Sequence, residues 1–171
     1  HDLEQRCWQT HVPDSLDLNI PVPLIVDLHG YTSNSTNHRE LSDFDNIANE
    51  NGAIVVYPDG LTTPDLFNSN GNQGWNSGWC CGNPASDNTD DVGFIERVVE
   101  ISLEIHNIDS TRIYASGWSN GCAMAQRMAM DSSHIFTAVG CMSFYLLMSP
   151  NEVYSPIPIM EVHGFLDQVV L

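Results

Sequence analysis

The stretch Arg112-Ile-Tyr-Ala-Ser-Gly-Trp-Ser-Asn-Gly121 leads directly into Cys122-Ala-Met-Ala-Gln-Arg-Met-Ala-Met130. It begins as a short apolar strand, and the residues that follow it favour a helix with small side chains. Gly117 and Gly121 flank Ser119 in a G-x-S-x-G pattern. Glycine at both places permits a sharp strand-to-helix turn, because a side chain there would clash with the strand or the helix. The pattern predicts a nucleophilic Ser119; the alternative is a serine that only caps the helix.

Strands and helices alternate along the rest of the chain. Near-continuous apolar runs at Leu24–Leu28 and Ala53–Tyr57 are typical of buried parallel strands. Helices are expected from about His38 to Glu50, with Leu41, Phe44, Ile47 and Ala48 on one face, and from Asp91 to about His106. This order predicts one α/β domain over residues 1–171, with a mostly parallel sheet and helices on both faces.

Three segments that carry polar side chains follow expected strands. His29-Gly30 follows the strand at Leu24–Leu28, Ser119 follows a strand at Ile113–Ala115, and His163-Gly164 follows one at Ile157–Val162. Active sites of parallel sheets lie beyond the carboxyl ends of the strands, so these segments are expected to meet at one edge. A further strand is expected at Phe136–Val139, and residues 61–90 form a long loop of the kind that is usually functional.

A nucleophilic serine needs a base, normally a histidine oriented by an acid. In α/β-hydrolases, whose strand-to-helix turn the G-x-S-x-G pattern resembles, the chain order is serine, acid, histidine. Asp167 is the best candidate acid because it lies just past the last expected strand, although a helix-capping aspartate is the alternative. No histidine follows Asp167. His29 and His163 each precede a glycine at a strand end, where an imidazole is more often a structural hydrogen-bond partner. We therefore expect the base to lie beyond Leu171 and this domain to be incomplete.

The transition state of acyl transfer carries a negative oxygen, which two backbone N–H groups usually stabilise. The expected donors are Tyr31, in the loop after the His-Gly pair, and Asn120, directly after the nucleophile. Trp75, Trp79 and Trp118 are candidates for an aromatic wall that binds substrate, and packing in the core or loop is an equal alternative.

The charge and cysteine content excludes several classes of function. The chain has 22 acidic residues, five arginines and no lysine, for a net charge of −17. This excess repels phosphate backbones, so no nucleic-acid partner is expected, and no stretch has the length of a membrane span. The number of cysteines, five, is odd, so at least one has no partner within the chain. Their spacing is not that of a zinc site, so no metal site is expected. Disulfides are plausible, but their connectivity does not follow from the sequence, and the alternative for Cys122 and Cys141 is that they are buried small hydrophobic residues.

Five segments in order carry a resemblance to a known family. They are Pro23–Gly30, Gly74–Gly82, Thr89–Ile95, Arg112–Gly121 and His163–Val169. Together they resemble the secreted polyhydroxybutyrate-depolymerase-like esterases, which include the feruloyl and acetylxylan esterases of carbohydrate esterase family 1.

The resemblance implies an α/β-hydrolase fold that here lacks the C-terminal strand and helix. It implies Ser119 as nucleophile, Asp167 as triad acid and a histidine in a later segment. It also implies secretion, no cofactor, and a substrate that is a polysaccharide-linked feruloyl or acetyl ester or a hydroxyalkanoate polyester. A serine peptidase of the same fold and a non-catalytic carbohydrate-binding domain remain alternatives.

Overall fold

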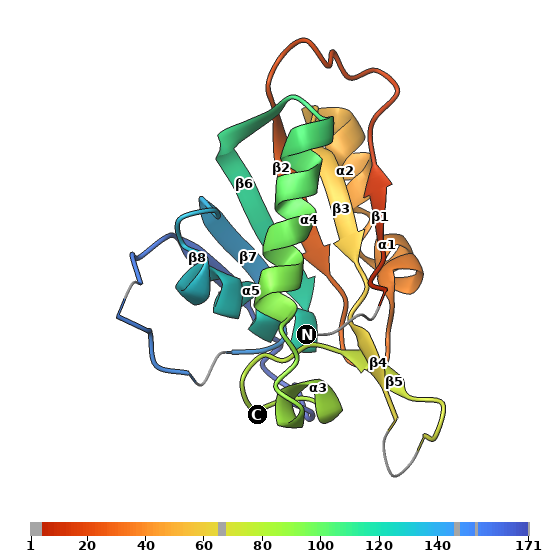
Figure 1. The fold of residues 1–171 in the computed structure, drawn as a ribbon, viewed down its shortest axis with the longest axis vertical. Coiled ribbons are helices and arrows are strands. Elements are labelled where there is room, and N and C mark those ends of the chain that lie inside the picture. Colours follow the sequence, from red (N-terminus) through yellow and green to blue (C-terminus); the bar gives the residue numbers. More distant parts are fainter. Residues whose placement is uncertain (1–4, 65–67, 146–147, 153, 171) are drawn as a thin grey trace.

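A six-stranded sheet in the order β1-β3-β2-β6-β7-β8 forms the centre of the protein (Figure 1). The computed structural model describes residues 5–64, 68–145, 148–152 and 154–170. Every neighbouring pair is parallel except β1 with β3. The strands are β1 (Trp8–His11), β2 (Val22–Leu28), β3 (Ile54–Pro58), β6 (Ile108–Trp118), β7 (Ala138–Met142) and β8 (Ile159–Val162). The expected mostly parallel sheet is thus confirmed.

Helices cover both faces of the sheet (Figure 1). One face carries α4 (Asp91–Ile105) and α5 (Asn120–Asp131), and the other carries α1 (Ser35–Ser42) and α2 (Phe44–Asn51). This arrangement is the α/β-hydrolase architecture that the sequence predicts. A small hairpin and a short helix lie at the carboxyl ends of the strands: β4 (Leu61–Thr63), β5 (Asn72–Gly74) and α3 (Asn83–Ser86).

The single helix expected from His38 to Glu50 is wrong, since the chain forms two helices that meet at Asp43. Asp43 has φ 56° and ψ 24°, the left-handed conformation that ends α1. Aspartate tolerates this conformation better than most residues, so the break has a local cause. The expected apolar face is split as a result: Ala48 is buried, whereas Leu41 is 60% exposed and Ile47 is 43% exposed.

Three further boundaries differ from expectation. β6 extends five residues further toward the N-terminus than the expected Ile113, and β7 begins at Ala138 rather than Phe136. Phe136 is instead a core residue that is 1% exposed. β8 begins at Ile159 rather than Ile157, so Pro158 lies before the strand and its missing N–H costs no ladder bond. The Pro158 carbonyl accepts a hydrogen bond from the Val139 N–H at 3.0 Å.

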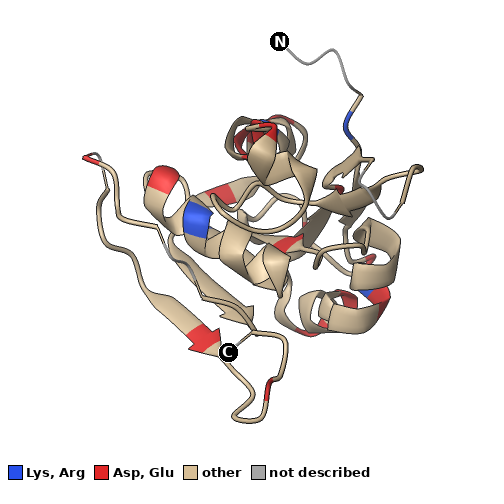
Figure 2. Cartoon of the chain, turned by 90° about the horizontal axis from the view of Figure 1, so that it is seen from below, with Lys and Arg blue, Asp and Glu red and all other residues tan. Residues whose placement is uncertain are grey.

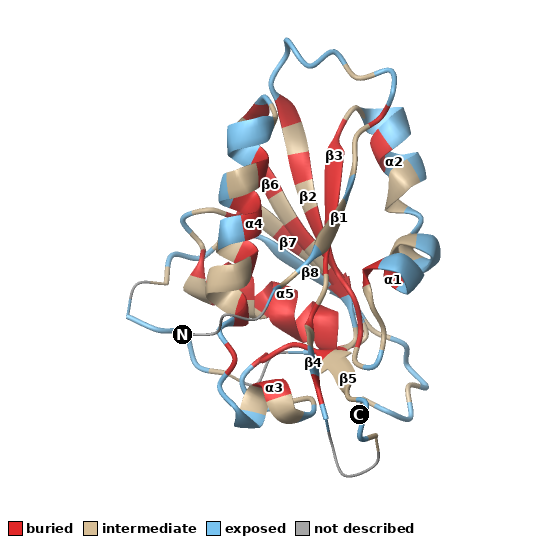
Figure 3. Ribbon diagram, turned by 45° about the vertical axis from the view of Figure 1, so that its right-hand side comes forward, coloured by how far each residue is buried: buried red, intermediate tan, exposed pale blue. Residues whose placement is uncertain are grey.

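The core lies between the central strands and α4 and α5, while the β8 edge is open (Figure 3). On β8, Ile159 is 43% exposed, Met160 65% and Val162 47%. None of the described helices has the length and apolar character needed to cross a membrane.

The cysteines form two disulfides, Cys80–Cys81 and Cys122–Cys141. The alternative that Cys122 and Cys141 are only buried hydrophobic residues is therefore wrong: α5 and the adjacent β7 place their sulfurs within bonding reach. Cys7 is free and exposed. The odd number of cysteines predicts such a residue.

Candidate active site

The turn between β6 and α5 has the geometry of a nucleophile elbow. Ser119 adopts φ 55° and ψ −124°, a conformation that non-glycine residues rarely enter and that costs roughly 1–3 kcal/mol. The flanking glycines are needed for close approach. A Cβ on Gly121 would lie 2.0 Å from the Leu28 carbonyl oxygen, and a Cβ on Gly117 would lie 2.5 Å from the Gly121 backbone. The chain therefore holds a strained serine where a strand gives way to a helix.

The carboxyl ends of β6, β7 and β8 are aligned. Trp118 pairs with Met142, which in turn pairs with Val162. Just beyond this row, the Ser119 N–H donates to the Met142 carbonyl at 2.9 Å. Since neighbouring strands lie about 4.8 Å apart, the segment after Val162 begins two strand spacings from the elbow. This segment contains Asp167, so the structure places Ser119 and Asp167 on the same edge of the sheet.

His29 fixes the loop after β2. Its Nε2 accepts a hydrogen bond from the Gly60 N–H at 2.8 Å, and its Nδ1 lies 2.8 Å from the Gly30 carbonyl oxygen. The ring is fully buried, and burial lowers the pKa of His29 to about 4. A backbone N–H can only donate, so Nε2 carries no proton and Nδ1–H donates to Gly30. His29 is thus a neutral structural residue of the loop.

The same loop approaches the elbow closely. A Cβ on Gly30 would lie 3.5 Å from the Ser119 Cβ and 3.3 Å from the Trp118 carbonyl oxygen. The Gly30 carbonyl faces the His29 ring, and the N–H of Tyr31 belongs to the same planar peptide unit. In a trans peptide the N–H points away from the carbonyl, so the Tyr31 N–H is directed away from His29. The expected oxyanion donors, Tyr31 and Asn120, therefore lie on segments that meet at Ser119.

The side chain of Asn120 has a role that the sequence analysis missed. It is fully buried, and its Oδ1 accepts from the Trp75 N–H at 2.8 Å. Its Nδ2 donates to the Trp75 carbonyl at 3.2 Å, to Ser77 Oγ at 3.3 Å and to the Cys80 carbonyl at 3.2 Å. One amide thus fastens residues 75–80 onto the elbow. No pattern in a single sequence signals this long-range contact.

The three tryptophans occupy different environments. Trp75 is fully buried and its indole N–H donates to the His29 carbonyl at 2.8 Å, so its ring has no surface to offer a ligand. Trp79 is 53% exposed and its ring lies 5.5 Å from that of Phe144. Trp118 is 42% exposed and lines a cavity of about 400 Å³ together with residues of β7, β8 and α1. Trp75 is therefore a packing residue, and the other two keep exposed rings near the elbow.

Asp167 lies in a turn that stabilises its charged form. Its Oδ1 accepts the N–H groups of Val170 at 3.0 Å and Val169 at 2.8 Å, and these bonds lower the pKa of Asp167. His163 Nε2 lies 3.5 Å from Asp167 Oδ2 and 2.9 Å from the Val170 carbonyl, and the latter bond raises the pKa of His163. Asp167 is thus an ionised carboxylate beside an imidazole.

In the described part of the chain, no histidine ring hydrogen-bonds the Ser119 hydroxyl. The rings of His29 and His163 contact backbone carbonyls instead. The base that the sequence analysis expects beyond Leu171 lies outside the described residues. Across those residues, no group of three or more histidine, cysteine, aspartate or glutamate side chains could hold a metal ion.

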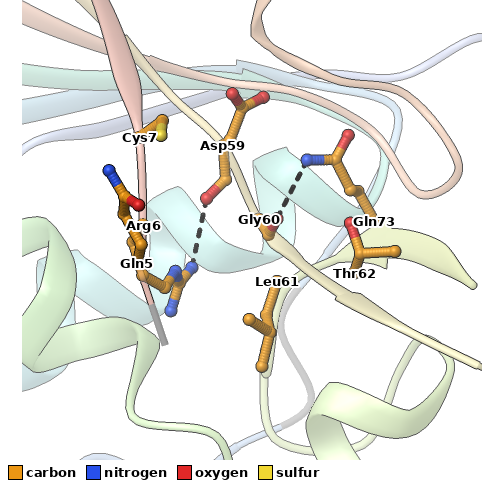
Figure 4. A pocket seen from close by; sticks show the side chains of 8 residues that line it. All are labelled: Gln5, Arg6, Cys7, Asp59, Gly60, Leu61, Thr62 and Gln73. Carbon is orange, nitrogen blue, oxygen red and sulfur yellow. Dashed lines mark hydrogen bonds between the residues drawn. The ribbon is translucent and has the colours of Figure 1, made fainter. Parts of the chain in front are cut away.

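Seen from below in the view of Figure 1, acidic segments are scattered over the chain and outnumber basic ones (Figure 2). A cavity of about 360 Å³ opens beside the N-terminal segment (Figure 4). There the Arg6 guanidinium donates to the Asp59 carbonyl at 3.2 Å, and Gln73 donates to the Gly60 carbonyl at 3.2 Å. None of the expected catalytic residues lines this cavity.

A family model described as esterase PHB depolymerase matches residues 7–171. The chain belongs to this family. Feruloyl esterase B of Thermothelomyces thermophilus is 31% identical over 132 residues, which are 75% of this chain and 40% of the relative. A bifunctional acetylxylan esterase/xylanase of Neocallimastix patriciarum is 24% identical over 165 residues, covering 96% of this chain and 22% of the relative. The chain thus spans less than half the length of either protein.

A solved structure supports the fold assignment. A carboxylesterase from Bacillus cereus superposes with a TM-score of 0.66 at 18% identity, over 98% of this chain and 74% of that one. At this identity the likeness establishes the fold alone. The recognition made from the five sequence segments is confirmed by the family match.

Proposed function

We propose that this domain is the nucleophile-bearing part of a serine carboxylic-ester hydrolase. Its substrate is a polysaccharide-linked feruloyl or acetyl ester or a hydroxyalkanoate polyester. The observation that carries the proposal is the strained backbone of Ser119 at the end of β6, opposite the loop that His29 fixes. A residue in so costly a conformation persists where function requires it. The feruloyl and acetylxylan esterases among the relatives support the ester class.

The chemistry follows from the positions of these groups. A histidine supplied from beyond Leu171 takes the Ser119 proton as the hydroxyl attacks the acyl carbon. Asp167, whose charged form is stabilised by backbone N–H groups, orients that imidazole. The N–H groups of Tyr31 and Asn120 hold the oxyanion, and the alcohol leaves with a proton from the histidine. Water then attacks the acyl-enzyme as the histidine takes its proton, and Ser119 leaves with that proton as the carboxylic acid is released.

The exposed rings of Trp79 and Trp118 are the proposed contacts for the acyl or sugar part of the substrate. Export from the cell is also part of the proposal. Two disulfides fit an oxidising compartment, since cytosolic thiols are kept reduced.

The test is ester hydrolysis by the product of the whole gene. A feruloyl ester, an aryl acetate and a matched anilide are assayed with the wild type, Ser119→Ala and the control Ser110→Ala, which alters an exposed serine at the far end of β6. We expect ester cleavage that Ser119→Ala lowers by at least about 10³-fold and that Ser110→Ala leaves unchanged. Substantial activity in Ser119→Ala would refute the nucleophile, and cleavage of the anilide alone would refute the ester class.

A further inference from the structure

We infer that the Cys80–Cys81 disulfide is a positioning element of the active site, through which a dithiol reductant lowers the activity. The inference rests on the proposed function. The disulfide lies in residues 74–82, hereafter the elbow-covering loop, which the Asn120 side chain fastens to the elbow. It therefore sits one hydrogen bond from the residue whose N–H is the proposed oxyanion donor.

One of the four hydrogen bonds between the Asn120 side chain and the loop is made to the carbonyl of Cys80. That oxygen accepts from Asn120 Nδ2 at 3.2 Å and from the hydroxyl of Ser77. Asn120 is fully buried and Ser77 is fully buried, so neither group can exchange its partner for bulk water. A shift of the Cys80 carbonyl leaves the buried Ser77 hydroxyl without this acceptor, which costs about 1–3 kcal/mol, and removes one of the three acceptors of Asn120 Nδ2. The position of this carbonyl is thus coupled to the position of Asn120.

The disulfide has a local effect because its two cysteines are adjacent in the sequence. A cross-link around one peptide bond restricts only Cys80 and Cys81, and it removes little entropy from the unfolded chain. The Cys122–Cys141 disulfide, with a sequence separation of 19, restricts a much longer loop. The adjacent pair is therefore expected to contribute little to global stability and to stiffen the elbow-covering loop instead.

The two disulfides also differ in their access to solvent. Cys80 and Cys81 are partly exposed, whereas Cys122 is fully buried and Cys141 is 6% exposed. Thiol–disulfide exchange requires a thiolate to reach a sulfur atom, so a reductant attacks the adjacent pair first. Trp79 directly precedes Cys80, and its exposed ring packs against the buried Phe144. Release of the cross-link therefore loosens both the hydrogen bond between the Cys80 carbonyl and the Asn120 side chain and the position of the Trp79 ring, a proposed substrate contact.

The chemical step is a complete exchange. The two thiols of dithiothreitol give two electrons and two protons to the Cys80 and Cys81 sulfurs. The Sγ–Sγ bond breaks, two cysteine thiols form, and the reagent closes to its own cyclic disulfide. No metal or further oxidant takes part. Removal of the reductant and addition of an oxidised dithiol reverse the step.

The test compares the wild type with the Cys80→Ser/Cys81→Ser double variant, and with Cys7→Ser as the control for the exposed free thiol. Alkylation and mass spectrometry identify which cysteines are reduced at each dithiothreitol concentration. Amide hydrogen exchange of residues 75–81 reports the loop, and hydrolysis of a feruloyl ester by the whole gene product reports kcat. We expect reduction of Cys80–Cys81 before Cys122–Cys141, faster exchange in the loop, and a fall in kcat of about tenfold. This loss is smaller than the 10²–10³ that accompanies removal of a whole oxyanion donor.

The double variant separates this inference from other effects of the reductant. It should match the reduced wild type in kcat and loop exchange, melt within a few degrees of the wild type, and no longer respond to mild reduction. If the wild type hydrolyses esters equally well with the pair oxidised and reduced, the inference is wrong while the proposed function stands. If the whole gene product hydrolyses no ester in either redox state, the proposed function itself fails.

Discussion

The Gly60 N–H donates a hydrogen bond of 2.8 Å to Nε2 of His29, a ring that is wholly enclosed by the protein. The other ring nitrogen faces the Gly30 carbonyl at 2.8 Å. One imidazole thus joins the end of β2 to the segment after β3 and directs the peptide that precedes Tyr31. The Gly60 contact requires the neutral ring, because a protonated Nε2 would be a donor facing a donor.

This requirement predicts a dependence of stability on pH. Burial lowers the pKa of His29 from 6.5 to about 4, so between these values the unfolded chain binds more protons than the folded protein. The stability that the neutral ring contributes is present above pH 6.5 and is lost as the pH falls toward 4. The expected loss at pH 4 is about 3 kcal/mol, since each pH unit corresponds to about 1.4 kcal/mol. Urea unfolding measured from pH 7 to pH 4 tests this value.

The variant His29→Gln isolates this contribution. It should be less stable than the wild type at pH 7 by about 1–3 kcal/mol because a buried hydrogen bond is lost or weakened. Its stability should then fall less steeply between pH 6.5 and pH 4 than that of the wild type. His134→Gln is the matched control because His134 is exposed, and it should keep the steep slope. An equally steep slope in His29→Gln would contradict the assignment.

Gly121 is predicted to be the least replaceable glycine of the elbow. A Cβ there would lie 2.0 Å from the Leu28 carbonyl and 2.6 Å from the His29 carbonyl, both of which are backbone atoms that cannot swing aside. We expect Gly121→Ala to cost more than about 3 kcal/mol and to give little folded protein. Gly140→Ala is the control, because its Cβ would lie 3.7 Å from the Met160 methyl group, an ordinary contact. The melting temperatures of the two variants test this prediction. Equal values for Gly121→Ala and Gly140→Ala would contradict the close packing at the elbow.

Glycine at position 119 is predicted to make the folded protein more stable than a residue that carries a Cβ. Its φ of 55° and ψ of −124° are strained for any residue with a Cβ, whereas glycine enters this region without the steric cost. Ser119→Gly should therefore be more stable than Ser119→Ala by about 1 kcal/mol or more, although both variants lose the hydroxyl. Chemical denaturation of the two variants gives the difference directly. A Ser119→Ala protein that is at least as stable as Ser119→Gly would show that the turn is relaxed.

The sequence predicted those parts of the fold that depend on local patterns. The G-x-S-x-G turn and the apolar runs of β2 and β3 are local signals, and the structure has these elements where they were expected. The break at Asp43 was missed because it depends on one residue that enters the left-handed conformation, while the apolar pattern continues across it. The apolar pattern predicts one continuous helix, whereas the left-handed conformation of Asp43 divides it into two. The pattern alone therefore does not locate the break.

The candidate site divides in the same way. The placement of Ser119 and Asp167 on one edge follows from strand order, which the alternation of elements predicts. The burial of Trp75 and the four contacts of the Asn120 side chain join residues about 45 positions apart in the sequence. Such contacts arise only when the elbow-covering loop folds over α5. A single sequence carries no periodic signal for them.

The ion pair between the partly buried Arg6 and the buried Asp91 ties the N-terminal segment to α4. The guanidinium donates to Asp91 Oδ1 at 2.7 Å and lies 3.9 Å from the centre of the Phe94 ring. The second carboxylate oxygen accepts the Asn76 N–H at 2.6 Å, and Asp91 is fully buried. Burial raises the pKa of Asp91, and Arg6 opposes that rise. The charged carboxylate therefore depends on its cationic partner.

Removal of the guanidinium should leave a buried charge without compensation. We expect Arg6→Met to cost about 3–5 kcal/mol at pH 7. The pKa of Asp91 should rise further in this variant, so the folded protein takes up a proton as the pH falls, and the cost should shrink toward pH 5. Arg6→Met/Asp91→Asn should recover most of the loss at pH 7, because an uncharged amide needs no cation and keeps an oxygen for the Asn76 N–H. Arg97→Met, which removes the exposed partner of Glu100, is the control and should melt with the wild type. A pH-independent cost in Arg6→Met would show that lost packing against Phe94, and not the buried charge, sets the stability of this segment.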